Sequence, residues 1–201
     1  MTYMPLLFSL EGKKVLLIGA GAIGQRKLEK LLNYTSSITI MTKECSHSMK
    51  KIIHENKLIL ITKSYEPNDV KDYDIIIATI DNLDLQKSIY QEAKKYSKLY
   101  NCVDFPEYCD FMFPSIVQKG DLQIAFSTGG YSPGLAKALR ALFERIIPDA
   151  VIPFLEEMKV LRKMHPKGEN RQKIFHDKVN VFVKQHFIMP TNGEDLNGKT
   201  R

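Results

Sequence analysis

The sequence lacks any hydrophobic run long enough to cross a membrane. None of its apolar stretches approaches the eighteen or so residues that a transmembrane helix requires. The N-terminal residues M-T-Y-M-P also lack the charged region and the cleavage site of a secretory signal. These absences argue against an integral membrane protein, and we expect a cytoplasmic protein without a membrane partner.

Cysteine is scarce, with three residues at positions 45, 102 and 109. An odd number without C-x-x-C spacing indicates neither a disulfide framework nor a zinc ribbon, so we expect reduced thiols. The five histidines also show no spacing typical of a preformed metal site. We therefore expect no metal that is held by the protein itself.

The charge of the chain is moderately basic, with 29 Lys and Arg against 23 Asp and Glu among 201 residues and a net charge of +6. Such a balance is compatible with nucleic acid, with a polyanionic small molecule, or with a basic surface that has no partner. Because the lysines are spread through the chain and do not form one block, we expect no nucleic-acid partner.

The segment from Gly12 to Lys27 combines a short apolar run with three spaced glycines. Val15–Ile18 has the length and the β-branched content of a buried parallel strand. Gly19, Gly21 and Gly24 follow with G-x-G-x-x-G spacing, and apolar residues then recur at helical spacing. A glycine turn between a strand and a helix N-terminus predicts a dinucleotide site, because free N–H groups there attract phosphate. A purely structural turn is the alternative.

Short apolar runs alternate with helix-patterned segments over the first hundred residues. This alternation predicts an α/β fold with a Rossmann-type doubly wound parallel sheet. An apolar lead-in at residues 5–10 is expected to pack on the edge of that sheet. Further strands are expected at 38–41, 58–61, 74–79 and 99–103, and helices at about 44–55 and 85–96.

The pattern changes near residue 113. Extended runs around 113–117 and 122–126 flank a Lys-Gly-Asp turn, which predicts an antiparallel hairpin. Ser132 is a good N-cap and Pro133 a good first helical residue, so a helix should begin there and end at Pro148. This region differs in kind from the alternating segment before it.

Two more helical stripes follow, one beyond Pro153 and one after the Pro-Lys-Gly turn at 166–168. They predict a small C-terminal helical domain, and the polar tail after it is expected to be disordered. The expected organisation is a nucleotide-binding Rossmann domain at 1–112, the hairpin and helix at 113–147, the helical domain at 148–189 and the tail at 190–201.

Polar residues follow two of the predicted strands. Thr79 closes the apolar run at 74–79, at the carboxyl edge where ligands of doubly wound sheets bind. NAD-binding folds usually place an acidic residue after the second strand to hold the ribose 2′-hydroxyl, and this chain has Lys43 and Glu44 there. Glu44 would suit NAD, whereas Lys43 would suit the 2′-phosphate of NADP, so the motif leaves this choice open.

Two other segments carry groups suited to catalysis or substrate binding. Asp104 follows the strand predicted at 99–103, where its carboxylate could accept a proton during hydride chemistry; a turn-capping aspartate is the alternative. Ser127, Thr128 and Gly129 offer hydroxyls and backbone N–H groups for a substrate carboxylate, or they simply let the chain turn. No G-x-S-x-G elbow surrounds Ser127, which argues against a serine hydrolase.

Several motifs together resemble the precorrin-2 dehydrogenase family, whose segment also forms the N-terminal part of siroheme synthases. Separated blocks in the right order are far more specific than three glycines. Within residues 3–165 these blocks are P-L-L-F at 5–8, G-Q-R-K at 24–27, N-C-V-D at 101–104, F-M-F-P-S-I at 111–116 and S-T-G-G-Y-S-P at 127–133. Gly24 stands where the family often has alanine, a difference that the fingerprint tolerates.

The resemblance implies NAD-dependent dehydrogenation of precorrin-2, a tetrapyrrole, to sirohydrochlorin in siroheme biosynthesis. Some members insert iron as a second, sirohydrochlorin ferrochelatase activity. The resemblance also implies a homodimer joined through the region 113–147, a catalytic aspartate at Asp104 and a substrate-site residue at Thr128. Its cofactor-contacting positions fall on Gly19, Gly21, Ala22, Ile23, Lys43 and Glu44.

Two other classes of function stay open at this point. A non-catalytic nucleotide-sensing regulatory module would use the same fold, but it would lack a carboxylate beside the nicotinamide. A nucleic-acid binder would need basic residues gathered on one face and salt-sensitive binding to DNA.

Overall fold

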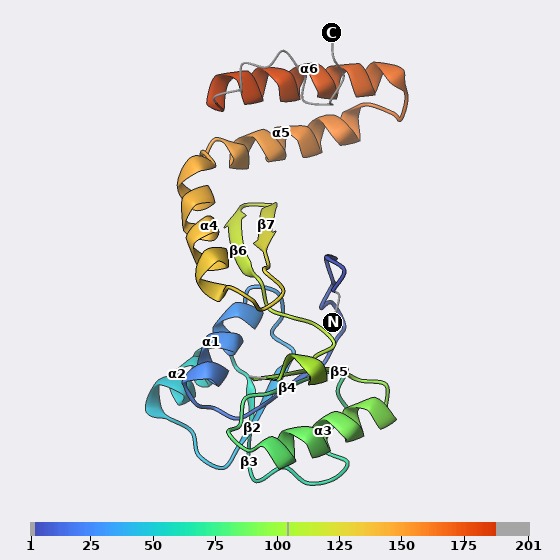
Figure 1. Cartoon of the computed structure of the whole chain (residues 1–201). Helices are drawn as coiled ribbons and strands as arrows, with labels where there is room; N and C mark the ends of the chain where they lie inside the picture. The colour runs from blue at the N-terminus through green and yellow to red at the C-terminus, as the bar shows by residue number, and fades with distance from the viewer. Residues whose placement is uncertain (1–2, 104, 188–201) are drawn as a thin grey trace. The chain divides into compact units, whose positions relative to one another are not determined.

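The computed structural model describes residues 3–103 and 105–187, and the chain divides into two compact units (Figure 1). The first unit is Met1–Phe113 and the second is Pro114–Arg201. Asp104 and the tail at 190–201, for which we made predictions above, lie outside the described residues.

Five parallel strands form the sheet of the first unit, in the order β3–β2–β1–β4–β5. The chain runs outward from β1 to β3 and then returns to the other side of β1, so the order reverses between β1 and β4. This reversal is the topological switch point of a doubly wound sheet, as the alternating pattern predicted. The strands are β1 (Val15–Ile18), β2 (Ile38–Thr42), β3 (Ile59–Thr62), β4 (Ile75–Ala78) and β5 (Leu99–Cys102).

Helices cover both faces of this sheet. The helices α1 (Ala22–Leu31) and α2 (His47–Glu55) pack on one face, and α3 (Leu83–Lys95) packs on the other. Every residue of β1 is buried, and successive side chains alternate between the two faces, with Leu17 toward α1 and Leu16 toward α3. Burial on both faces explains why the two central strands β1 and β4 are continuous apolar runs and not alternating ones.

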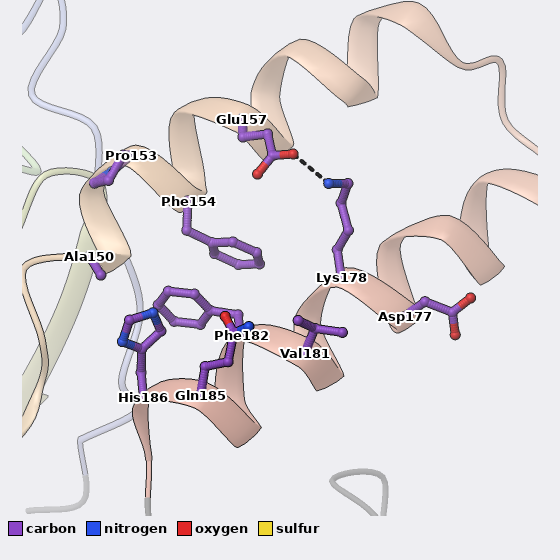
Figure 2. A pocket seen from close by; sticks show the side chains of 10 residues that line it. All are labelled: Ala150, Pro153, Phe154, Glu157, Asp177, Lys178, Val181, Phe182, Gln185 and His186. Atoms are coloured by element: carbon purple, nitrogen blue, oxygen red, sulfur yellow. Dashed lines mark hydrogen bonds and ion pairs between the residues drawn. The ribbon is translucent and has the colours of Figure 1, made fainter.

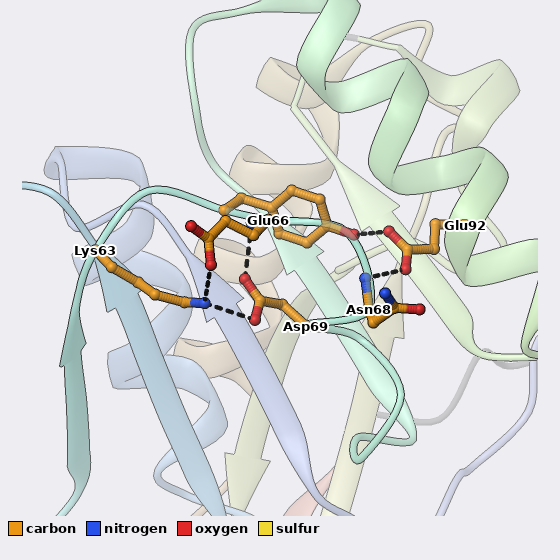
Figure 3. A network of polar contacts seen from close by, with 6 residues as sticks. Lys63, Glu66, Asn68, Asp69 and Glu92 are labelled. Atoms are coloured by element: carbon orange, nitrogen blue, oxygen red, sulfur yellow. Dashed lines mark hydrogen bonds and ion pairs between the residues drawn. The ribbon is translucent and has the colours of Figure 1, made fainter.

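A run of turns, and not a helix, joins β3 to β4, and a polar network fastens it to α3 (Figure 3). Glu92 of α3 accepts hydrogen bonds from the Tyr65 hydroxyl and from the backbone N–H of Asn68. At the start of the same connection, the Lys63 ammonium lies 2.8 Å from the Asp69 carboxylate. The Glu92 side chain of α3 therefore fixes the position of this connection, which has no helix of its own to pack on the sheet.

The N-terminal segment departs from our expectation that it would pack on the sheet edge. Residues 6–8 are half or more exposed, and within 5–10 it is Leu10 that packs against the core. Near the start of the segment, the Tyr3 hydroxyl oxygen lies 3.1 Å from the Pro106 carbonyl oxygen and 3.3 Å from that of Cys109, and it donates to both. One core residue and one hydroxyl fix the segment, which leaves the apolar side chains between them in solvent.

The second unit contains the predicted antiparallel hairpin of β6 (Ser115–Lys119) and β7 (Leu122–Phe126). Gly120 has a φ of +57° in the two-residue turn, a left-handed conformation that favours glycine. The helix α4 (Pro133–Ile146) packs on both strands, and α5 (Val151–Met164) contacts both β7 and α6 (Glu169–His186). The helix α5 begins two residues before Pro153, which lies in its first turn.

Candidate functional site

The candidate site lies at the switch point of the parallel sheet, where β1 and β4 end side by side. Ile18 pairs with Ala78 at the last position of the two strands. The Thr79 N–H then donates to the Ile18 carbonyl at 2.7 Å, and the Gly19 N–H donates to the Met41 carbonyl at 2.8 Å. The glycine turn is thus attached to both neighbours of β1, in the crevice where doubly wound sheets bind ligands.

Gly19 and Gly24 are required by the packing of the protein itself. Gly19 has a φ of +99°, and a Cβ there would lie 2.8 Å from the backbone oxygen of Thr79. A Cβ at Gly24 would lie 2.5 Å from the Gly19 carbonyl oxygen. The Thr79 hydroxyl fills the space between them and donates toward the Ile18 and Gly19 carbonyls at 3.1 and 3.0 Å.

Gly21 is different, because the packing of the described residues does not require a glycine there. Its φ is −75°, which any residue adopts, and a Cβ there would meet none of the described residues within 4 Å apart from its chain neighbours. It is the N-cap residue of α1, and no side chain caps that helix end. The first intrahelical bond runs from Gln25 to Gly21, so the N–H groups of Ala22 and Ile23 precede it and lie at the exposed helix N-terminus. Open space beside uncapped N–H groups fits the pyrophosphate of a dinucleotide.

The end of β2 presents the two charged residues that the sequence singled out. Lys43 and Glu44 are both exposed, and the Thr42 hydroxyl donates to the Glu44 carbonyl at 2.7 Å, which fixes the turn after the strand. Within the described part of the chain, neither charged side chain takes part in an ion pair. The turn therefore offers a carboxylate for a ribose hydroxyl and an ammonium for a phosphate.

A lysine of α1 lies at the end of β5, and we had not included it among the predicted site residues. The ammonium of Lys27, on α1, contacts the side-chain oxygen of buried Asn101 and lies 5.0 Å from the centre of the Phe113 ring. The Asn101 amide donates in turn to the Phe111 carbonyl at 2.8 Å. The sequence could have indicated this lysine by its helical spacing, because Lys27 is one turn beyond Gly24 on a helix that packs against the sheet.

The predicted substrate-binding segment lies in the second unit. Thr128 Oγ1 accepts from the Ser132 N–H at 3.0 Å, and Ser127 Oγ accepts from the Gly129 N–H at 3.3 Å. Gly129 and Gly130 have positive φ, so the chain turns tightly here. Each hydroxyl accepts one hydrogen bond and donates none to the described residues, so its hydrogen can donate to a carboxylate ligand.

A groove of about 510 Å³ lies between α5 and α6 and contains none of the predicted site residues (Figure 2). The rings of Phe154 and Phe182 stack in it with centroids 4.2 Å apart. An ion pair between Lys178 and Glu157 lies at its rim. The stack and the ion pair both join α5 to α6, so the residues that line the groove hold the two helices together.

The described residues, 3–103 and 105–187, contain neither a cluster of metal ligands nor a helix that could span a membrane. No group of three His, Cys, Asp or Glu residues there lies close enough to hold a metal ion. In the same residues, no helix has the length and apolar character needed to span a bilayer.

Comparison with known proteins agrees with the geometry of the turn. Residues 6–115 match a family model described as "Putative NAD(P)-binding". The chain is 33% identical to a siroheme synthase of Ruthia magnifica subsp. Calyptogena magnifica over 150 residues, which are 75% of this chain and 32% of that protein. It is 36% identical to a siroheme synthase of Psychrobacter cryohalolentis over 148 residues, which are 74% of this chain and 28% of that protein.

A longer match, at 29% identity over 182 residues, is to a siroheme synthase of Nitrosococcus oceani and covers 89% of this chain and 39% of that protein. The chain therefore spans between 28% and 39% of the length of these three curated relatives. Among solved structures, "SirC, precorrin-2 dehydrogenase" has the same fold, with a TM-score of 0.74, 21% identity and coverage of 92% of this chain and 91% of that one. These matches confirm the family resemblance that the sequence motifs indicated.

Proposed function

Because this chain belongs to the NAD(P)-binding family and is a relative of the siroheme synthases, we propose that it is an NAD-dependent dehydrogenase that oxidises precorrin-2 to sirohydrochlorin. The relatives supply the choice of substrate. The turn at Gly19–Gly24 supplies the choice of cofactor class.

The observation that carries the proposal is the space beside Gly21. A glycine at this position is not explained by backbone conformation or by packing, because φ is ordinary and, chain neighbours aside, no described residue comes within 4 Å of the place of a Cβ. The uncapped N-terminus of α1 next to it provides N–H donors and a favourable dipole. A bound pyrophosphate accounts for both features.

The proposed chemistry divides between cofactor and protein. NAD would supply the hydride acceptor, and dehydrogenation also requires a base that takes one proton from the macrocycle. We assign that base to Asp104, by its position after β5. We assign the hydroxyls of Ser127 and Thr128 to hold a carboxylate of the substrate, since each has a hydrogen to donate.

We also propose that the active form is a homodimer in the cytoplasm. Leu135, Leu142 and Ile146 on α4 are between 42% and 51% exposed, and their spacing of seven and four residues places them on one face of the helix, where a second copy of the chain could cover them. The three cysteines form no disulfide in the described residues, as suits a reducing compartment.

The decisive experiment is incubation of the purified protein with precorrin-2 and NAD while the absorption spectrum is followed for sirohydrochlorin. We expect NAD-dependent conversion, and a parallel reaction with NADP measures which cofactor the Lys43 and Glu44 turn prefers. Conversion that is no faster than in the absence of protein would reject the dehydrogenase. Tight NAD binding without conversion would instead favour the nucleotide-sensing module.

A further inference from the structure

Two buried thiols face each other at the carboxyl end of β5. Cys102 is the last residue of the strand, and Cys109 follows the short helix η1 (Pro106–Tyr108). Each residue is 6% exposed, and the two Sγ atoms are 3.7 Å apart. Both thiols lie within hydrogen-bonding reach of the Phe105 carbonyl, at 3.4 and 3.5 Å, so they approach it together.

The backbone holds the two cysteines in this position. The Cys102 N–H donates to Cys109 Sγ at 3.3 Å. Beyond the cysteines, the Asp110 N–H donates to the Tyr100 carbonyl at 2.8 Å, and the Tyr100 N–H donates to Asp110 Oδ2 at 2.9 Å. The two ends of the loop are therefore clamped by contacts that do not depend on the thiols.

We propose that Cys102 and Cys109 are a latent redox pair that closes into an intramolecular disulfide around residues 103–108. An S–S bond is about 2.0 Å long, so the sulfurs must approach by roughly 1.7 Å, a movement within the reach of side-chain rotation and small loop shifts. The third cysteine, Cys45, is half-buried on the segment before α2 and is not part of this pair.

The oxidant is a small-molecule disulfide of the glutathione class. The thiolate of one cysteine attacks the disulfide and forms a mixed disulfide, which releases one small thiol. The second cysteine then attacks the sulfur of the first cysteine in the mixed disulfide, and a second small thiol leaves. The protein loses two protons and two electrons, and the oxidant takes them up to become two thiols.

The surroundings make the pair slow to react but favourable at equilibrium. Burial is the largest cause that raises the pKa of the Cys102 thiol, to about 12, so almost no thiolate is present at neutral pH in the closed loop. Attack therefore requires local opening. Once one sulfur is oxidised, reclosing returns its partner to within bonding reach, which favours the internal disulfide over the mixed one.

The test is a redox equilibration in which Cys45→Ser removes the other thiol. The full chain is held in mixtures of reduced and oxidised glutathione, folded in buffer or unfolded in guanidinium, and the free thiols are alkylated before mass spectrometry. Because the fold holds the sulfurs together, we expect the folded chain to form the internal disulfide with an equilibrium constant at least about tenfold above that of the unfolded chain.

An equal or smaller constant in the folded chain would overturn the proposal, as would a product made only of mixed or intermolecular disulfides. Two control proteins, Cys45→Ser with Cys102→Ser and Cys45→Ser with Cys109→Ser, each keep one thiol of the pair. Neither can form the internal disulfide, because that bond requires both sulfurs, so mixed and intermolecular disulfides are the products expected from them. This test uses no enzyme activity and is independent of the proposed function.

Discussion

Gly21 and Gly19 lie two residues apart, but a side chain at each would meet very different surroundings. At Gly21 we expect Gly21→Val to fold with nearly unchanged thermal stability, since apart from its chain neighbours no described residue lies within 4 Å of the new Cβ. Its affinity for NAD should fall by at least about tenfold, because the side chain takes the space of the pyrophosphate. Calorimetric titration with NAD and a melting curve measure both quantities.

Gly19→Ala is the matched control in the same turn. Its φ of +99° and the 2.8 Å approach to Thr79 should destabilise the folded chain by about 2 kcal/mol or more. The two variants therefore separate a glycine kept for the ligand from one kept for the fold. Equal loss of stability in both, with NAD affinity retained in Gly21→Val, would contradict this assignment.

Asp104→Asn tests the proposed base. Asparagine keeps the shape of the side chain but cannot accept the proton, so we expect oxidation of precorrin-2 to slow by about 10²-fold or more. Affinity for NAD and the melting temperature should stay near the parent values. An unchanged rate would move the base elsewhere, and loss of NAD binding as well would indicate a structural role.

Local patterns predicted single residues well where chain neighbours decide their role, and poorly where contacts across the sheet do. The spacing of the glycines was enough to predict the turn. The clamp by Thr79 and the contact between Lys27 and Asn101 join residues more than fifty positions apart, so no local pattern encodes them. We placed Thr79 correctly at the strand end, but its bonds to the glycine turn required the structure.

At the scale of elements, the connection between β3 and β4 relies on the Tyr65 hydroxyl. Burial first, and then the hydrogen bond to Glu92, raises the pKa of Tyr65 above its ordinary value. The folded chain therefore favours the protonated phenol, whose stabilisation is complete below about pH 10, the ordinary pKa of tyrosine, and is lost as the pH rises above it.

We expect Tyr65→Phe to lower stability by about 1 kcal/mol at neutral pH through the lost hydrogen bond. Between about pH 8 and about pH 11 it should then lose less stability than the parent. Urea unfolding at both pH values measures the difference. Tyr100, whose pKa is raised mainly by burial, is present in both proteins, and the charge of Tyr65 is the smallest contribution to its shift, so its loss of stability is nearly the same in the two. Equal losses of stability in the two proteins over this pH range would show that the pKa of Tyr65 does not differ between the folded and the unfolded chain.

The types and order of the elements followed from the sequence, because apolar period and cap residues are local. Ser132 accepts from the Leu135 N–H at 3.4 Å and begins α4 at Pro133, as predicted. The prediction that the N-terminal segment packs on the sheet edge was wrong for a physical reason. An apolar run shows that burial would be favourable, but it does not show that a surface is available to bury it. Residues 6–8 find none in the described chain.

At the scale of the whole molecule, the exposed apolar face of α4 is the feature to test. We expect the parent to sediment as a dimer at micromolar concentration and Leu142→Glu to shift it toward monomer, because a charge buried in an apolar interface is unfavourable. Leu83→Glu makes the same exchange at another exposed leucine, at the start of α3, and should leave the mass unchanged. A monomeric parent would refute the dimer.

The position of β3 at the edge of the sheet determines which part of the first unit opens first. Its residues are half-buried or exposed, with Ile59 62% exposed, whereas every residue of β1 is buried. Amide hydrogens on β3 should therefore exchange with solvent through local fraying, and those on β1 only when the whole unit unfolds. The glycine turn continues β1 and is hydrogen-bonded to Met41 of β2 and to Thr79, the residue after β4. Nucleotide binding should therefore persist when β3 frays at the sheet edge, and it should be lost when the central strands unfold.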